Sequence, residues 1–133
     1  MPDVIALSLI ADILLAVQVE EAANRLGFRV ATVSTPEKAI GALKQGRASL
    51  FILDTSAAEG RVAEVVQAAR SAPYPVAVLV FGPQADPNGL QAARAAGADV
   101  VVSSEAFGRE RGPLLIACLD RHREAAARRG AKG

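Results

Sequence analysis

Apolar runs of strand length alternate along this chain with stretches of helical period, and the alternation repeats five times. The apolar runs cover residues 4–10, 28–33, 49–54, 76–81 and 99–104. Continuous apolar runs such as 4–10 are typical of parallel strands that are buried on both faces. Parallel strands need right-handed crossovers, which place helices over one face or the other. The pattern therefore predicts an α/β fold: a doubly wound, five-stranded parallel sheet of order 2-1-3-4-5 in a three-layer α/β/α sandwich.

Helix boundaries are marked by capping residues. Asp12 is a candidate N-cap for the first helix, and Gly27 stands where a C′ glycine would end it. The second helix has a Ser/Thr cap, Pro36 in its first turn and Glu37 at capping-box spacing from Ser34. The stretches between the later apolar runs predict the remaining crossover helices at residues 61–70 and 90–97.

The last helix is expected to open near Pro113 and to bury three residues, Leu115, Cys118 and Leu119. Beyond it, the segment 123–133 loses its apolar period, so we predict a polar tail that frays into solvent. The predicted domain boundaries are therefore 1–122 for a single compact domain and 123–133 for the tail. A length of 133 residues fits one domain with a real core.

Composition excludes several classes of function. The formal net charge is +1, which provides no net attraction to nucleic acid or to an anionic membrane. The basic residues of the tail are interrupted by acids and have no interleaved aromatics, which is typical of a solvated helix end. Cys118 is the only cysteine, so neither an internal disulfide nor a cysteine-based metal site is expected. The N-terminal segment has no basic region before its apolar run, and we expect a cytoplasmic protein.

Polar residues near strand ends are the candidate functional groups. The run "SLFILD" ends at Asp54, and Asp12 follows the first run, so both are expected at the carboxyl ends of neighbouring strands. Ser8 lies within an apolar run, where a buried hydroxyl usually bonds to backbone. His122, the only histidine, follows Cys118 by four and is expected to be a half-buried residue at a helix edge. No acid, base and nucleophile converge, so we do not expect an enzyme.

Several segments carry a family resemblance over essentially the whole chain. The pair Gly27-Phe28, the run "SLFILD", the segment "ARAAGADVVVSS" and the fivefold alternation resemble the receiver domain of bacterial two-component response regulators, which has a flavodoxin-like fold. The segments "DILLAVQVEEAANRLGF" and "VFGPQADPNGLQAARAAGADVVVSSEAF" are similar to a group of small stand-alone receiver-like proteins. The resemblance implies the phosphotransfer residues of that family, position by position.

The resemblance places the family's two metal-binding acids on Ile10 and Ala11, so both are missing. Asp12 lies one position later and is at best one displaced carboxylate. Of the family's site, only the phosphoacceptor position is kept, at Asp54. One or two carboxylates hold Mg²⁺ only weakly, because the ion prefers near-octahedral oxygen ligands and keeps its water. We therefore expect no cofactor beyond weakly bound Mg²⁺ and no dedicated metal site.

The other functional positions of the family are also replaced. Its hydroxyl position after the fourth strand falls on Gly82, and its lysine position after the fifth strand falls on Ser104. Glu105 stands where a proline would follow. The segment "GPQADPNG" matches no phosphate-binding glycine motif, so a loop is expected there.

These observations favour a degenerate receiver, a protein-interaction module in signalling that does not depend on phosphorylation. By resemblance, the partner would be another protein or a second copy, forming a homodimer through the face of helix 4, strand 5 and helix 5, about residues 88–122. Two alternatives remain. One is a receiver phosphorylated on Asp54 with an altered Mg²⁺ site. The other is a protein that binds a small ligand in the vacated crevice, whose candidate residues are Ser8, Asp12, Asp54, Gly82 and Ser104.

Overall fold

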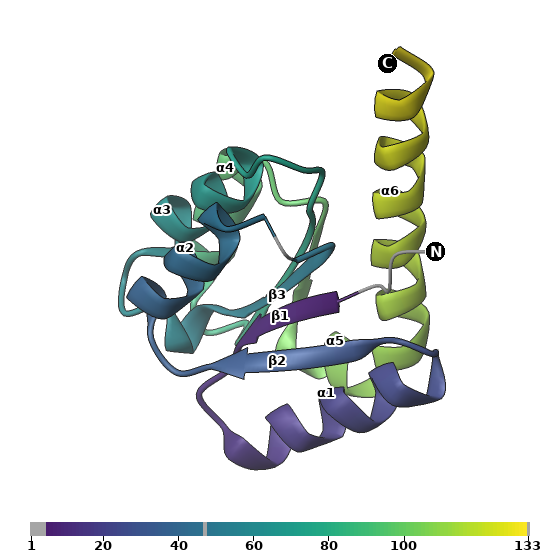
Figure 1. Ribbon diagram of the computed structural model, residues 1–133. Coiled ribbons are helices and arrows are strands. Elements are labelled where there is room, and N and C mark those ends of the chain that lie inside the picture. The colour runs from purple at the N-terminus through teal and green to yellow at the C-terminus, as the bar shows by residue number, and fades with distance from the viewer. Residues whose placement is uncertain (1–4, 47, 133) are drawn as a thin grey trace.

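A single five-stranded sheet forms the centre of the protein (Figure 1). The computed structural model describes residues 5–46 and 48–132. The strands are β1 (Ile5–Leu9), β2 (Arg29–Val33), β3 (Leu50–Asp54), β4 (Ala77–Gly82) and β5 (Val100–Ser103). All neighbouring pairs are parallel, in the order β2-β1-β3-β4-β5. The predicted doubly wound sheet is thus confirmed.

Helices cover both faces of this sheet (Figure 1). They are α1 (Ile13–Arg25), α2 (Pro36–Lys44), α3 (Val62–Arg70), α4 (Pro87–Ala96), α5 (Ser104–Arg109) and α6 (Arg111–Lys132), with a short 3-10 helix η1 (Thr55–Ala57) after β3. Helices α2, α3 and α4 lie on one face, and α1, α5 and α6 on the other. This arrangement gives the three layers that the alternation of segments predicts.

Two apolar cores lie on opposite sides of the sheet, and β3 contributes to both. Phe51 and Leu53 face α2, α3 and α4, whereas Leu50 and Ile52 face α1, α5 and α6. Every residue of β3 is buried. Successive side chains of a strand point to opposite faces, so a central strand covered on both faces must be apolar throughout. The continuous run before Asp54 is explained by this packing.

The end of the chain differs from the expectation. Strand β5 stops at Ser103, whose Oγ accepts from the Ala106 N–H at 3.1 Å and caps α5, an additional helix. Helix α6 then begins at Arg111, near Pro113 as expected. Strand β5 therefore ends one residue before the predicted limit of 104. Ser103 caps a helix, and the backbone must leave the sheet where that helix begins.

Helix α6 continues to Lys132 and so includes most of the segment that was expected to be a polar tail. Its C-terminal half extends beyond the sheet (Figure 1). The predicted burial of Leu115, Cys118 and Leu119 is confirmed. The division into a domain at 1–122 and a tail at 123–133 stays a prediction. No helix in the described residues is long and apolar enough to cross a membrane.

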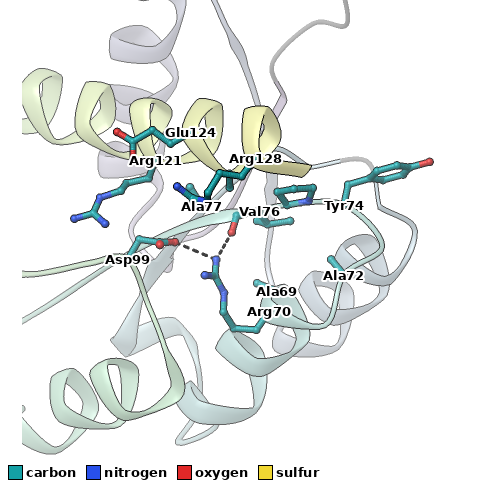
Figure 2. Close-up of a pocket in the computed structure, with 12 residues that line it drawn as sticks. Ala69, Arg70, Ala72, Tyr74, Val76, Ala77, Asp99, Arg121, Glu124 and Arg128 are labelled. Carbon is teal, nitrogen blue, oxygen red and sulfur yellow. Dashed lines mark hydrogen bonds and ion pairs between the residues drawn. The ribbon is translucent and has the colours of Figure 1, made fainter. Parts of the chain in front are cut away.

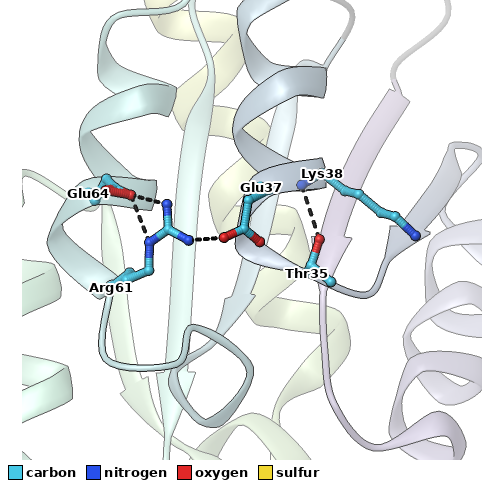
Figure 3. Close-up of polar contacts among 5 residues, drawn as sticks. All are labelled: Thr35, Glu37, Lys38, Arg61 and Glu64. Carbon is cyan, nitrogen blue, oxygen red and sulfur yellow. Dashed lines mark hydrogen bonds and ion pairs between the residues drawn. The ribbon is translucent and has the colours of Figure 1, made fainter.

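Helix α2 is capped one residue later than predicted. The Lys38 N–H donates to Thr35 Oγ1 at 3.2 Å, so Thr35 and not Ser34 is the N-cap (Figure 3). Glu37 instead accepts from Arg61, which also binds Glu64 and joins α2 to α3. The backbone amide at Glu37, followed by the Arg61 guanidinium, holds the pKa of the Glu37 carboxyl below its ordinary value. Because these groups are solvent-exposed, the network contributes little to stability.

Candidate functional site

The carboxyl ends of β3, β4 and β5 meet at one edge of the sheet. In the strand register, Asp54 is paired with Phe81, and Gly82 is paired with Ser103. These positions are therefore neighbours, as expected for the end of a doubly wound sheet at which ligands usually bind. The chemistry available at this edge depends on what each side chain contacts.

Asp54 is buried, with 6% of its surface exposed. Its Oδ1 accepts from the Ser56 N–H at 3.0 Å, which caps the 3-10 helix η1. An aspartate that bonds to the N–H two residues ahead forms a local turn and satisfies a backbone donor that would otherwise lack a partner. Asp54 therefore has a structural role at the end of β3.

Asp12 is the N-cap of α1, as its position after the first apolar run predicts. Its Oδ1 accepts from the Leu14 N–H at 2.9 Å and the Leu15 N–H at 3.3 Å. Within the described residues, the side chains of Asp12 and Asp54 accept hydrogen bonds from backbone donors in their own turns. The two carboxylates thus serve separate elements instead of a shared ligand.

The donor set does not fit Mg²⁺. Ile10 is buried in the apolar core. By the family resemblance, this position would carry a metal-binding acid. In the parts of the chain that the structure describes, no three or more His, Cys, Asp and Glu side chains form a group able to hold a metal ion. Mg²⁺ is usually held by carboxylates in an octahedral oxygen shell. Two carboxylates that both cap local turns do not provide such a shell.

Thr55 occupies the space beside Gly82. A Cβ built on Gly82 would collide with Thr55 Oγ1 and would lie 3.0 Å from Thr55 Cγ2. Thr55 is 5% exposed, and its Oγ1 is buried without a hydrogen-bond partner in the described residues. Gly82 stands at the family's hydroxyl position and has no side chain. The hydroxyl of Thr55, the residue directly after β3, occupies the space that a side chain at Gly82 would need. Sequence alignment by spacing does not detect this exchange, because the two residues are far apart in the chain.

Ser8 and Ser104, two of the crevice candidates, lie in different surroundings. Ser8 is fully buried, and its Oγ lies 3.0 Å from Thr32 Oγ1, which donates to Glu20. The partner is therefore a side chain and not the backbone that we expected. Ser104 is the first residue of α5. Five cavities in the described residues are lined by side chains other than the crevice candidates, which are Ser8, Asp12, Asp54, Gly82 and Ser104.

An aromatic pair fills the sheet face beside the end of β3. Phe81, the register partner of Asp54, stacks on Phe107 of α5 with ring centroids 4.2 Å apart. Both rings are 1% exposed, and the Arg111 guanidinium lies 5.5 Å from the Phe107 centroid. The sequence does not reveal this pair, because Phe107 belongs to the helix that was not predicted. Apolar rings at this place make the edge less suited to a charged ligand.

Cys118 and His122 lie on α6, away from this edge. Cys118 is fully buried, and burial raises the pKa of its thiol to about 12, so the thiol stays protonated and unreactive. His122 is half-buried, as predicted. Burial lowers the pKa of His122 from its ordinary value of 6.5, and this effect exceeds the opposing effect of the Pro75 carbonyl.

The lowered pKa of His122 predicts a pH-dependent stability. Below pH 6.5 the unfolded chain takes up the proton first, so the free energy of unfolding falls as pH decreases from 6.5 toward the folded-state pKa. Because His122 is the only histidine, His122→Gln should remove this dependence. Urea unfolding at about pH 7.5 and 5.5 measures it in both proteins. Equal loss of stability in the wild type and the variant would contradict the prediction.

Several solved structures resemble this chain over most of its length. A CheY-like response-regulator receiver domain from Methanospirillum hungatei JF-1 has a TM-score of 0.77 and 15% identity, covering 92% of this chain and 98% of that chain. The beryllofluoride-activated NtrC4 receiver domain dimer has a TM-score of 0.72 and 17% identity, covering 89% and 98%. No family model and no curated protein matches the sequence.

A third similar structure is the receiver domain of the response regulator Ssk1, in a co-crystal with the Saccharomyces cerevisiae histidine phosphotransfer signaling protein Ypd1. Its TM-score is 0.64 at 11% identity, covering 77% of this chain and 79% of that chain. At these low identities the likeness concerns the fold. The chain has the receiver fold of response regulators, and the fold expected from the resemblance is confirmed.

Proposed function

We propose that this protein is a protein-interaction module of cytoplasmic signalling whose partner binding does not depend on phosphorylation of Asp54. The fold supports a signalling role, because the structures that it resembles are receiver domains of response regulators. Fold alone does not define an activity, so the proposal depends on the site. A working phosphoacceptor would need an accessible carboxylate and a divalent cation beside it.

The observation that carries the proposal is the local use of both carboxylates. Asp54 caps η1, and Asp12 caps α1. The family's other two functional positions are Gly82 and Ser104. Thr55 occupies the space beside Gly82, and Ser104 begins α5. Transfer of a phosphoryl group requires compensation of its charge, which this set of groups is poorly suited to supply. Interaction through the outer surface then remains as the function that this fold supports best.

The first candidate surface is the face formed by α4, β5 and α6, within residues 88–122. Strand β5 lies at the sheet edge, and all four of its residues are partly exposed. Ile116 of α6 adds an aliphatic side chain that is 44% exposed. A partly apolar edge strand is able to pair with another protein or with a second copy. Among similar structures, the NtrC4 receiver is a dimer and the Ssk1 receiver is in a complex.

A second apolar surface lies on α1. Ile13, Leu14 and Val17 are 81%, 68% and 42% exposed, although they are large aliphatic side chains. Ile13 and Val17 also line a cavity of about 530 Å³ between α1 and the end of β2. Clustered exposed aliphatic side chains indicate a contact surface more strongly than single ones. The proposed partner contact therefore has two candidate locations.

The proposal predicts that Asp54→Asn leaves the fold, the oligomeric state and partner binding unchanged. Asparagine retains the side-chain oxygen that accepts from the Ser56 N–H, so the free energy of unfolding should change by less than about 1 kcal/mol. Chemical denaturation and light scattering after size-exclusion chromatography measure stability and oligomeric state. Loss of a partner interaction in this variant would refute the proposal.

An amide NMR titration with Mg²⁺ and beryllofluoride, which imitates an aspartyl phosphate, separates the proposal from its alternative. The alternative is a phosphoacceptor with an altered metal site, favoured by the unpartnered Thr55 hydroxyl next to Asp54. Under the proposal, neither the wild type nor Asp54→Asn shows shifts at residues 54, 55 and 82. Shifts in the wild type alone would establish the alternative.

A further inference from the structure

A cavity of about 330 Å³ lies between α6 and the beginning of β4 (Figure 2). Val76 and Ala77 lie at the amino end of β4, and Asp99 precedes β5. The cavity is therefore at the amino edge of the sheet, opposite Asp54. Six residues of a parallel strand separate the two edges by roughly 17 Å. This site is thus distinct from the edge at which the family's phosphotransfer residues lie.

Arg70, the last residue of α3, is held in place at the base of this cavity. One of its terminal nitrogens, Nη2, donates to the Val76 carbonyl and to Asp99 Oδ2, the latter at 3.0 Å (Figure 2). The Val78 N–H donates to the same Asp99 oxygen at 2.8 Å.

This anchoring leaves part of the guanidinium available. A guanidinium carries five N–H donors in a rigid plane, and the hydrogen bonds of Arg70 to Val76 and Asp99 use only its Nη2. The Nε and Nη1 donors have no such bond within the described residues. A guanidinium fixed by one nitrogen loses less entropy on binding a ligand than a free one does, since its geometry is already set. Arg70 therefore offers prepositioned donors at the cavity.

Two further arginines line the cavity from α6. Arg121 and Arg128 lie seven residues apart on this helix and extend toward the side on which Arg70 and Asp99 lie (Figure 2). Neither has an ion pair or hydrogen bond to another described residue. Glu124 also lines the cavity, but its carboxylate is directed away from Arg70 (Figure 2). Arg70, Arg121 and Arg128 together outnumber the two acids of the lining, Asp99 and Glu124, so the cavity has a positive excess of one charge.

We propose that this cavity binds a small organic oxyanion, a phosphate monoester or a carboxylate with a short apolar body. Guanidinium groups bind both oxyanions through paired N–H donors. The apolar part of the lining that a ligand can reach comes from Ala72, Tyr74, Pro75 and Ala125, since Ala69, Val76 and Ala77 are almost fully buried. The volume falls at the lower end of the range for small-molecule sites. The head group would contact the three arginines, and the apolar body would lie against the apolar part of the lining.

Phenyl phosphate and benzoate are suitable probes, because each joins an oxyanion to an apolar ring. In an amide NMR titration of the whole chain, we expect shifts at Val76, Asp99 and Arg121 with at least one probe. The double variant Arg121→Gln/Arg128→Gln should weaken binding about tenfold, since hydrogen bonds to charged groups are lost. Arg123→Gln is the matched control, because Arg123 is an exposed arginine of the same helix that does not line the cavity.

Binding of only one probe supports the proposal and identifies the head group. Absence of shifts with both probes up to about 10 mM, a concentration at which even weak sites fill, would overturn it. An equal loss of affinity in Arg123→Gln would also overturn the proposal, because the probes would then be attracted by the overall charge of α6 and not by the cavity. The fold of every variant is checked by its amide spectrum without a probe. These outcomes are independent of Asp54.

Discussion

Gly82→Ala is expected to destabilise the protein by about 1–3 kcal/mol, and the added change Thr55→Ala is expected to restore most of this loss. The new Cβ would collide with Thr55 Oγ1. In the double variant, the nearest remaining atom of residue 55 is Cβ, at 3.1 Å, which small shifts can accommodate. Thr55→Ala alone should cost little in hydrogen bonding, because its hydroxyl has no partner in the described residues.

Urea unfolding of the wild type, both single variants and the double variant forms a complete thermodynamic cycle. Gly41→Ala is the matched control, since Gly41 lies within α2 and a Cβ there would meet nothing within 4 Å. Alanine at such a helical position should stabilise by about 0.5–1 kcal/mol. If the changes in unfolding free energy of the two single variants simply add in the double variant, the Thr55 side chain does not occupy the space beside Gly82.

Phe107→Ala should cost the most of any single change considered, about 3–5 kcal/mol of unfolding free energy. The ring is 1% exposed, stacks on Phe81 at 4.2 Å and lies beneath the Arg111 guanidinium. Its removal leaves a cavity next to the register partner of Asp54 and removes the contact that holds α5 on the sheet. Thermal and urea unfolding measure the loss.

Phe107→Leu keeps most of the apolar volume and should lose distinctly less stability than Phe107→Ala, because the stacking is lost but no large cavity forms. Ile116→Ala provides a surface control on α6, since Ile116 is 44% exposed and its truncation should change stability by within about 1 kcal/mol. A small effect of Phe107→Ala, similar to that of the surface control, would show that α5 does not close this edge of the sheet.

The candidate site was only partly predictable, and particular residues show why. Asp12 was predicted as an N-cap because capping depends on local sequence, and the structure confirms it. An acid at the end of a strand suits both a reactive site and a turn, and only the structure shows that Asp54 caps η1. The contact of Thr55 with Gly82 and the stacking of Phe107 on Phe81 join distant segments, so no local pattern reports them.

Periodicity in the sequence by itself determined the fold: the apolar runs specify strands, the capping residues and glycines specify helix limits, and parallel crossovers allow few topologies. The resemblance places the family's metal-binding acids on Ile10 and Ala11, whose aliphatic side chains have no oxygen to bind a metal. Tertiary structure alone decided that Thr55 fills the place of a side chain at Gly82 and that Phe107 closes the sheet face. It also brought Arg70, Asp99 and the arginines of α6 together. Local preferences act over a few residues, whereas sites form between elements whose spacing depends on the packing of the whole core.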